Sequence, residues 1–263
     1  MPTKMSLRRL LAGCLASLLL SGCTRTRALV VGMDATYPPF EFIGTDGKIN
    51  GVSVAIGEAI GKVAGRPIEF RHISFEGLIP ALQSGQIDLI ISSLTANEER
   101  RGSIDFSEPY VKNGLAILAS KDGPVHSAED LNAEGRRVAV RLATTGEQWC
   151  RQSLPKATIV SLDNDTACVL EVRNGTVDAW VYDQVSIMNY NQQNPDRTRA
   201  LLAPLREEVW AVGLKKGREE LKAQVNQAIA EMKQSGAFAR LADQFLAKER
   251  ALMKAQGLPF VFE

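Results

Sequence analysis

The chain has 263 residues, of which 45% are hydrophobic, and it carries 31 lysines and arginines against 30 aspartates and glutamates. This length allows one large domain or two modest ones, each with a hydrophobic core. The near balance of charge excludes the basic excess of a nucleic-acid-binding protein and the charge blocks of a disordered tail.

Residues 1–22 are typical of an export signal. Three basic residues precede the apolar stretch from Leu10 to Leu20, which is too short to span a membrane as a helix. Leu20-Ser21-Gly22-Cys23 resembles the lipobox of bacterial lipoproteins, which predicts cleavage before Cys23 and its acylation. The alternative is ordinary cleavage nearby, which would release a soluble protein.

Removal of this signal takes away three basic residues and no acidic one, so the formal net charge falls from +1 to about −2. No second long apolar segment follows, so membrane contact is expected only through the lipid. Cys150 and Cys168 are the thiols left in the folded part. Export places them where disulfides persist, which favours one bridge over two separate buried cysteines.

The body of the chain alternates predicted strands and helices. In chain order we expect a strand at 28–33, a hairpin corner at Asp46-Gly47, a helix at 52–64, a strand at 67–73, a helix at 75–85 that ends at Gly85, and a buried strand at 88–93. Strand, helix and strand in succession predict a parallel sheet with right-handed crossovers.

One pattern occurs twice. "LQSGQIDLIISS" (82–93) aligns without a gap with "VRNGTVDAWVYD" (172–183), and "VVGMDAT" (30–36) resembles "VAVRLATT" (138–145) in layout. The repetition predicts two α/β lobes of similar design. The alternative is chance recurrence of a common α/β pattern.

Polar residues stand at the carboxyl end of each repeated strand, where open α/β sheets bind ligands. These strand ends are 34–37 and 92–95 in the first lobe, and 141–145 and 182–183 in the second. If the lobes face each other, the four loops line one cleft, which is a usual place for a small ligand.

The strand ends contain groups suited to both charges of a zwitterion. Thr95 and Glu98 have the spacing of a capping box, so a helix is expected to begin there, and Arg100 adds a guanidinium suited to a carboxylate. Thr144 and Thr145, which open the next helix, supply further N–H donors. Asp183, with the Ser93 carbonyl and the Thr95 hydroxyl, suits an ammonium group, and Tyr37 and Phe75 suit what lies between the charges.

Each residue also has a plainer interpretation. Arg100 can be a solvated helix charge, Asp183 only the N-cap of the next helix, and Tyr37 and Phe75 core residues. Their placement together at matched strand ends favours a site.

Four segments carry a resemblance to a known family. "GMDATYPPFEF", the 75–110 block, "ATTGE" and "VDAWVYD" resemble the family 3 solute-binding proteins, the polar amino-acid-binding proteins of ABC importers. The resemblance runs from about residue 28 to residue 247. It implies an α/β fold of the two-lobed periplasmic-binding-protein type (type II), each lobe a mixed sheet flanked by helices, with two hinge strands near 111–115 and 206–210.

The resemblance also implies domain boundaries and site roles. Lobe 1 comprises 28–112 and 208–250 and lobe 2 comprises 113–207, after a lipidated linker at 23–27 and before a tail at 251–263. Arg100 and the N–H groups of Thr95 and Thr145 would bind the α-carboxylate, while Asp183, Ser93 and Thr95 would bind the α-ammonium. The side chain of the ligand would meet Tyr37 and Phe75, and its polar end Asp34 and Ser92.

The identity of the amino acid rests on Asp34. A carboxylate near flat aromatic faces favours a polar or cationic ligand, arginine first, and an aliphatic ligand would leave Asp34 unpaired. The family often carries "GFDVDL" where this chain has "GVSVAI" (51–56), so Ser53 replaces an acid, and a glutamine amide remains a candidate partner of Asp34.

Two other functions remain as alternatives: a dehydratase of cyclic, prephenate-type acids on the same scaffold, and a ligand-sensing module. His72 and His126 are the only histidines, neither lies in a cleft loop, and no metal, cofactor or phosphate-loop motif occurs. We therefore expect a binding protein without cofactor or metal, outside the cytoplasm, that delivers its ligand to a cognate ABC permease.

Overall fold

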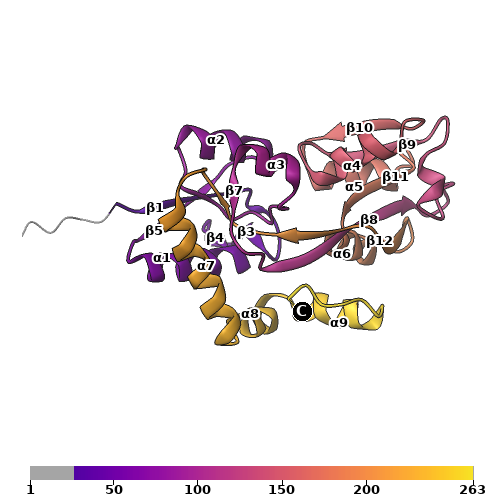
Figure 1. Cartoon of the computed structure of the whole chain (residues 1–263). Coiled ribbons are helices and arrows are strands. Elements are labelled where there is room, and N and C mark those ends of the chain that lie inside the picture. The colour runs from indigo at the N-terminus through magenta and orange to yellow at the C-terminus, as the bar shows by residue number, and fades with distance from the viewer. Residues whose placement is uncertain (1–26, 263) are drawn as a thin grey trace, which may run out of the picture.

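The computed structural model describes residues 27–262 (Figure 1). The predicted signal segment and the lipidation site Cys23 lie outside the described residues. Within residues 27–262, no helix is long and apolar enough to cross a membrane.

The first lobe is built on a five-stranded mixed sheet in the order β5-β1-β6-β13-β7. Its strands are β1 (Leu29–Met33), β5 (Ile68–His72), β6 (Leu89–Ile90), β7 (Asp105–Phe106) and β13 (Gly213–Leu214). β1 pairs parallel with β5 and β6, as strand–helix–strand succession predicts, while β13 returns late in the chain and pairs antiparallel with β6 and β7.

The helices of the first lobe cover this sheet (Figure 1). They are α1 (Val52–Ala64), the 3-10 helix η1 (Phe75–Gly77), α2 (Leu78–Ser84), α3 (Glu98–Ser103), α7 (Glu219–Gln234) and α8 (Ala237–Phe245). A small sheet of β2 (Thr36–Tyr37), β3 (Glu41–Ile43) and β4 (Ile49–Asn50) joins β1 to α1. Its β3–β4 corner lies at Asp46-Gly47, as predicted.

The second lobe has its own five-stranded mixed sheet, in the order β10-β9-β11-β8-β12. Its strands are β8 (Val111–Ser120), β9 (Arg137–Arg141), β10 (Thr158–Leu162), β11 (Ala179–Asp183) and β12 (Thr198–Trp210), and its helices are η2 (Glu129–Leu131), α4 (Thr145–Ser153), α5 (Asp165–Arg173) and α6 (Gln184–Gln193). The predicted fold class, two α/β lobes with mixed sheets, is confirmed.

Two long antiparallel strands, β8 and β12, connect the lobes (Figure 1). At the first-lobe end they pair from Val111 with Trp210 to Leu115 with Arg206. The register then shifts between Leu201 and Arg206. The two segments predicted to form the hinge are therefore partners in one continuous ladder.

The sequence repeat corresponds to equivalent structure in the two lobes. Asp88 accepts a hydrogen bond from the Val30 amide and donates its own amide to the Val30 carbonyl. Asp178 makes the same pair of bonds with Arg137. The glycine three residues before each aspartate has a positive φ, 80° at Gly85 and 69° at Gly175. Each aspartate thus fixes the strand after its helix to a neighbouring strand.

The two cysteines are not bridged, contrary to the favoured expectation. Both are free and buried. Cys150 packs with Val138 and Val140 on one face of the second sheet, whereas Cys168 packs with Ala139 on the other face. Because alternate residues of a strand point to opposite faces, the sheet itself separates the two thiols.

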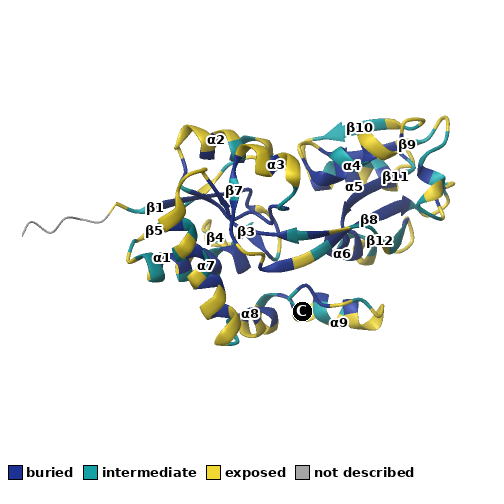
Figure 2. Ribbon diagram, viewed as in Figure 1, coloured by how far each residue is buried: buried dark blue, intermediate teal, exposed yellow. Residues whose placement is uncertain are grey.

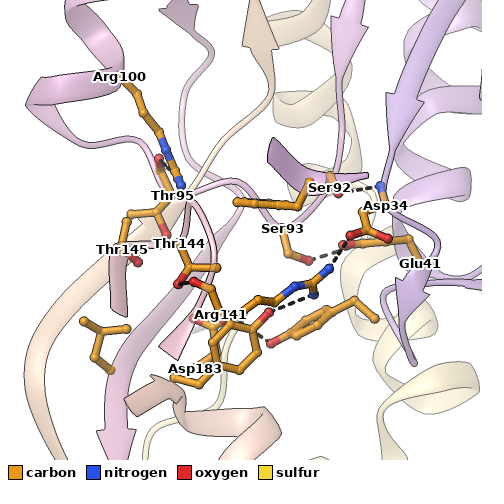
Figure 3. Close-up of a pocket in the computed structure, with 14 residues that line it drawn as sticks. Asp34, Glu41, Ser92, Ser93, Thr95, Arg100, Arg141, Thr144, Thr145 and Asp183 are labelled. Carbon is orange, nitrogen blue, oxygen red and sulfur yellow. Dashed lines mark hydrogen bonds and ion pairs between the residues drawn. The ribbon is translucent and has the colours of Figure 1, made fainter. Parts of the chain in front are cut away.

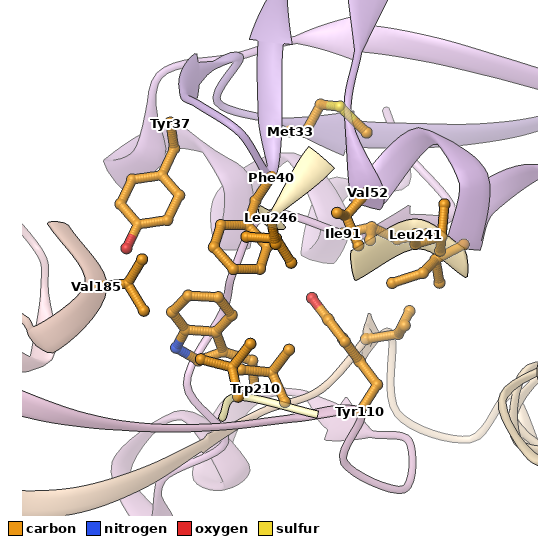
Figure 4. Packing of buried hydrophobic residues seen from close by; sticks show 14 of the residues in the cluster. Met33, Tyr37, Phe40, Val52, Ile91, Tyr110, Val185, Trp210, Leu241 and Leu246 are labelled. Atoms are coloured by element: carbon orange, nitrogen blue, oxygen red, sulfur yellow. The ribbon is translucent and has the colours of Figure 1, made fainter. Parts of the chain in front are cut away.

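The core of the first lobe is continuous with the inner surface of the second (Figures 2 and 4). Trp210, at the end of β12, is fully buried. Its ring lies 4.9 Å from that of Phe40 and 5.9 Å from that of Tyr37, both edge to face. Val185 of α6 belongs to the same cluster. The packing below the cleft therefore includes both lobes and a connecting strand.

A C-terminal segment, residues 247–262, returns along the lobes after α8. It begins with α9 (Ala247–Ala255), which packs on α6, where the Asn189 amide donates to Glu249 at 3.1 Å. The tail after α9 turns back, and the Val261 carbonyl accepts a 2.9 Å bond from the Lys112 amide of β8. The segment therefore contacts the second lobe and the connecting strands.

Candidate functional site

A cavity lies between the lobes, at the carboxyl ends of the strands. All ten residues that the sequence nominated line it: Asp34, Tyr37, Phe75, Ser92, Ser93, Thr95, Arg100, Thr144, Thr145 and Asp183. Four further residues complete the lining: Glu41, Leu115, Arg141 and Tyr182. Figure 3 shows Arg100, Thr95 and Thr145 at one end, and Asp34 and Glu41 at the other.

Arg100 is a buried cation, with 5% of its surface exposed. Its guanidinium donates to the carbonyls of Thr95 at 2.9 Å and Ala143 at 3.1 Å, and among the described residues it forms no ion pair. Burial lowers its pKa to about 10, against the attraction of Glu208, so it stays charged at neutral pH. A buried charge without an ionic partner is costly, and a bound carboxylate would supply that partner.

The helix that carries Arg100 begins later than the predicted capping box implied. α3 starts at Glu98, and the Asn97 side chain, not that of Thr95, caps it by accepting from the Arg100 amide at 2.9 Å. Asn caps a helix at least as well as Thr. Thr95 instead lies in extended backbone that bridges to Trp210.

Thr95 and Thr145 are drawn together by one residue of β12. Their hydroxyls donate to the same oxygen of Glu208, at 2.9 and 2.8 Å. The helix α4 opens at Thr144 and Thr145 as predicted: Thr144 is its N-cap and Thr145 its first residue, so the backbone N–H of Thr145 has no acceptor within the helix. Glu208 thereby holds one threonine of each lobe beside the Arg100 guanidinium.

Asp183 supplies the opposite charge. It precedes α6, but its side chain makes no capping bond. One oxygen accepts from the Tyr37 hydroxyl at 3.1 Å and the other from the Asn113 amide at 2.6 Å. Burial, and then the charge of Glu208, raise its pKa well above the ordinary value. An ammonium group placed beside it would favour the ionised form.

The far end of the cavity contains an ion cluster that sequence reasoning missed. Arg141, from the last position of β9, pairs with Asp34 of the first lobe and, at 3.1 Å, with Asp165 of its own lobe. The Tyr182 hydroxyl lies 3.3 Å from the same guanidinium. Burial would lower the pKa of Arg141, but the neighbouring Tyr182, Asp165 and Asp34 outweigh it and raise that pKa. Asp34 is thus a paired carboxylate.

The aromatic residues lie where the sequence placed them. The Phe75 ring lies between the two arginines, 5.5 Å from the guanidinium carbon of Arg100 and 5.8 Å from that of Arg141. Tyr37 packs against the Tyr182 ring at 6.0 Å while its hydroxyl reaches Asp183. Both aromatics serve the cavity and the packing around it.

Two non-glycine residues at the cavity have left-handed backbone, Ser93 with a φ of 47° and Ala143 with a φ of 62°. This conformation costs of the order of 1 kcal/mol or more for such residues. At Ala143 it accompanies the carbonyl contact with Arg100 across the cleft. The strain therefore coincides with a contact between the lobes.

Glu41 lies within the motif "GMDATYPPFEF", but the sequence predicts no role for it. It is 1% exposed, lines the cavity, and accepts from the hydroxyls of Ser53 at 2.6 Å and Ser93 at 3.2 Å. Burial raises its pKa from 4.5 to about 8, against those two hydrogen bonds. The sequence does contain a sign of this buried acid, because Glu41 stands between Phe40 and Phe42 at the start of β3.

Glu41 should make the protein less stable as the pH rises. Between the ordinary pKa of 4.5 and the folded value of about 8, the folded state binds a proton that the unfolded state has lost. The free energy of unfolding therefore falls, by up to about 1.4 kcal/mol per pH unit from this group. Urea unfolding across this range should show a shallower fall for Glu41→Gln, and an unchanged one for Glu58→Gln, an exposed control. Equal slopes for wild type and Glu41→Gln would contradict the assignment.

Comparison with known proteins identifies the family. The model of the bacterial extracellular solute-binding proteins, family 3, matches residues 29–248. The chain belongs to this family, as the sequence resemblance implied.

Individual relatives bind amino acids. The chain is 31% identical over 223 residues to the L-cystine-binding protein TcyJ of Escherichia coli (strain K12), a match covering 84% of this chain and 83% of that protein. An ancestral arginine-binding protein bound to arginine superposes with a TM-score of 0.77 at 35% identity, over 84% of this chain and 99% of that one. An ancestral amino-acid-binding protein, a precursor of cyclohexadienyl dehydratase, superposes with a TM-score of 0.75 at 34% identity, over 83% of this chain and 94% of that one.

Within residues 27–262, no group of three or more histidine, cysteine, aspartate or glutamate side chains has the arrangement of a metal site. His72 accepts a 3.1 Å bond from the Ala35 amide and lies beside Asp34, outside the cavity lining. His126 contacts Arg199 on the surface of the second lobe. Neither histidine faces the cavity.

Proposed function

We propose that this protein is the extracytoplasmic receptor of an ABC importer and captures a free polar amino acid between its two lobes. The observation that carries this function is the presence of two opposite charges in one cavity, Arg100 from the first lobe and Asp183 from the second. Arg100 is buried and forms no ion pair among the described residues. Together the two residues match the carboxylate and the ammonium of an α-amino acid. The lobes correspond to residues 28–112 with 208–250 and to residues 113–207. The captured amino acid is delivered to a cognate permease.

The binding cycle requires closure about β8 and β12. In solution scattering, a saturating amino acid should reduce the radius of gyration, because Arg100 and Asp183 approach the cargo from different lobes. The melting temperature should rise as well, by the equivalent of about 2.7 kcal/mol at 100 times the dissociation constant. A panel of the twenty amino acids, ornithine and cystine identifies the cargo. Binding by calorimetry with an unchanged scattering curve would contradict closure.

We further propose that the receptor is anchored by lipid on Cys23. Wild-type protein should then fractionate with membranes and have a blocked N-terminus at that residue. Cys23→Ser should release the protein or stop its processing. Wild-type protein that is recovered soluble, with an N-terminus beyond Cys23, would contradict the anchor.

The choice of cargo can no longer rest on Asp34. The expectation of a cationic amino acid, arginine first, assumed an unpaired Asp34, and the arginine-bound relative is consistent with it. In this chain Arg141 already pairs with Asp34. The argument against aliphatic cargo also assumed an unpaired Asp34, so it no longer holds. What remains is an α-amino acid recognised by Arg100 and Asp183, and we propose a polar side chain because Asp34, Glu41 and Arg141 line the far end of the cavity.

Catalysis is the alternative that one observation favours. Glu41 is a buried carboxylic acid that is mostly protonated at neutral pH and faces the cavity, as a general acid does. Binding is preferred because Glu41 is held by two serine hydroxyls and the cavity is built around opposite charges. Incubation with prephenate or arogenate tests this: aromatic product formed by wild type and lost in Glu41→Gln would favour the enzyme.

A further inference from the structure

Arg141 is held rigidly at the far end of the cavity. Only 5% of its surface is exposed. One terminal nitrogen donates to Asp165 at 3.1 Å and to Tyr182 at 3.3 Å, and the other contacts Asp34 and, at 3.5 Å, the Thr36 hydroxyl. These partners come from the residue that follows β1 and from β2, α5 and β11. The guanidinium is therefore a built part of the closed cleft.

Its position is the one that a cationic side chain of the cargo would need. It lies against the Asp34 carboxylate and 5.8 Å from the centre of the Phe75 ring. A carboxylate beside an aromatic face is a favourable environment for a guanidinium. Here the chain supplies that guanidinium itself, so a cationic cargo would have to share one carboxylate with a second cation.

The charges of the lining lead to the same conclusion. Two arginines, Arg100 and Arg141, face three acids, Asp34, Glu41 and Asp183. Burial raises the pKa of Glu41 to about 8, so this acid is largely neutral at physiological pH. Burial also raises the pKa of Asp183, but the ammonium of a bound amino acid favours its ionised form. With that ligand in place, two cations and two anions balance, which suits a cargo whose side chain has no net charge.

We propose that Arg141 is a specificity-determining residue: it excludes cationic amino acids and selects a cargo whose side chain has no net charge and offers an oxygen acceptor to the guanidinium. The carboxamide of glutamine or asparagine meets this description. So does the distal half of cystine, in which an ammonium and a carboxylate cancel. This inference rests on the proposed function and deepens it by naming the class of cargo.

Exclusion follows from like charge at short range among buried side chains. Placing a second cation beside Arg141 weakens binding by about 100-fold relative to a neutral cargo of similar size. Removing Arg141 reverses the preference, because Asp34 then becomes a buried carboxylate without its partner, and a cationic cargo supplies one.

The test compares glutamine, asparagine, cystine, arginine and lysine by calorimetry, with wild type, Arg141→Gln and Arg141→Lys. Wild type should prefer one of the three neutral ligands over arginine and lysine by about 100-fold. Arg141→Gln should gain at least about tenfold in affinity for arginine and lose affinity for the neutral ligand. Arg141→Lys keeps the charge and should keep the exclusion, which separates the charge from a general loosening of the fold.

Arg173→Gln is the matched control, because it removes a cation from an exposed position of the same lobe and should leave every affinity unchanged. Wild type that binds arginine or lysine most tightly would overturn the inference while leaving the proposed function standing. An Arg141→Gln variant with unaltered ligand ratios would overturn it too. Wild type that binds no amino acid at all would overturn the proposed function, and this inference with it.

Discussion

Replacing Arg100 with methionine should abolish amino-acid binding while the protein still folds. The variant keeps an unbranched apolar side chain but removes the guanidinium that lies over Phe75, and it leaves the α-carboxylate of the cargo buried without a cationic partner. Loss of such a partner costs about 3–5 kcal/mol, or roughly two to four decades of affinity. Folding should be unharmed, because Arg100 forms no ion pair among the described residues and donates only to two carbonyls.

Calorimetry with the best ligand of the panel measures the effect. Arg101→Met is the control, since Arg101 lies on the same helix with an exposed side chain over Phe106. Asp183→Asn should weaken binding severely by the same reasoning, applied to the ammonium. If Arg100→Met binds normally, Arg100 is not the carboxylate partner and the site assignment is wrong.

Replacing Trp210 with alanine should lower the free energy of unfolding by about 3–5 kcal/mol, the usual cost of deleting a fully buried tryptophan. Its ring fills the space below the cleft, against Phe40 and Tyr37 (Figure 4). Its indole nitrogen has no hydrogen-bond partner among residues 27–262, so the loss is one of packing. Urea unfolding followed by circular dichroism measures it.

Trp149→Ala provides the comparison, because Trp149 lies half-buried on α4. Its loss should cost clearly less, and Trp210→Phe should recover much of the stability. If both substitutions lower the free energy of unfolding equally, the cluster around Trp210 is packed no more tightly than the surroundings of Trp149. Because Trp210 ends a connecting strand, Trp210→Ala should also loosen the first-lobe end of the hinge.

The sequence predicts the fold well because local sequence patterns determine where its helices and strands begin and end. The repeat at 82–93 and 172–183 carries, in each copy, a helix end, a glycine and an aspartate that bonds the neighbouring strand. These features depend on residues within one helix–strand unit. The strand-end positions follow directly, and with them the ten residues around the cavity.

The ion cluster was missed because it depends on contacts between lobes. Arg141 was recognised as a strand end, but Asp34 lies 107 residues away in the chain and in the other lobe. Part of the signal was available. Arg141 shares its face of β9 with Ala139, the face that α5 covers, so its meeting with Asp165 at the start of α5 follows from the two-residue period of a strand. Its contact with Asp34 does not.

The prediction of a disulfide was wrong for a similar reason. Cysteine count and compartment favoured a bridge, but neither reports on which side of a sheet a helix packs. α4 and α5 cover opposite faces. The capping box at Thr95 failed more locally, because Asn97 competed for the same helix end and Thr95 was taken by Glu208, a residue 113 positions later.

The C-terminal segment bears on how tightly the cargo is held. α8 packs within the first lobe, while α9 after it lies against α6 of the second, so residues 247–262 form a third link beside β8 and β12. A receptor that binds only when its lobes are apposed shows an affinity reduced by the fraction of time it spends apart. Asn189 and Glu249 join α6 to α9 outside the cavity lining, so a substitution there alters this link between the lobes and no contact with the cargo. Two receptors with identical cavities can therefore retain the same amino acid for different times.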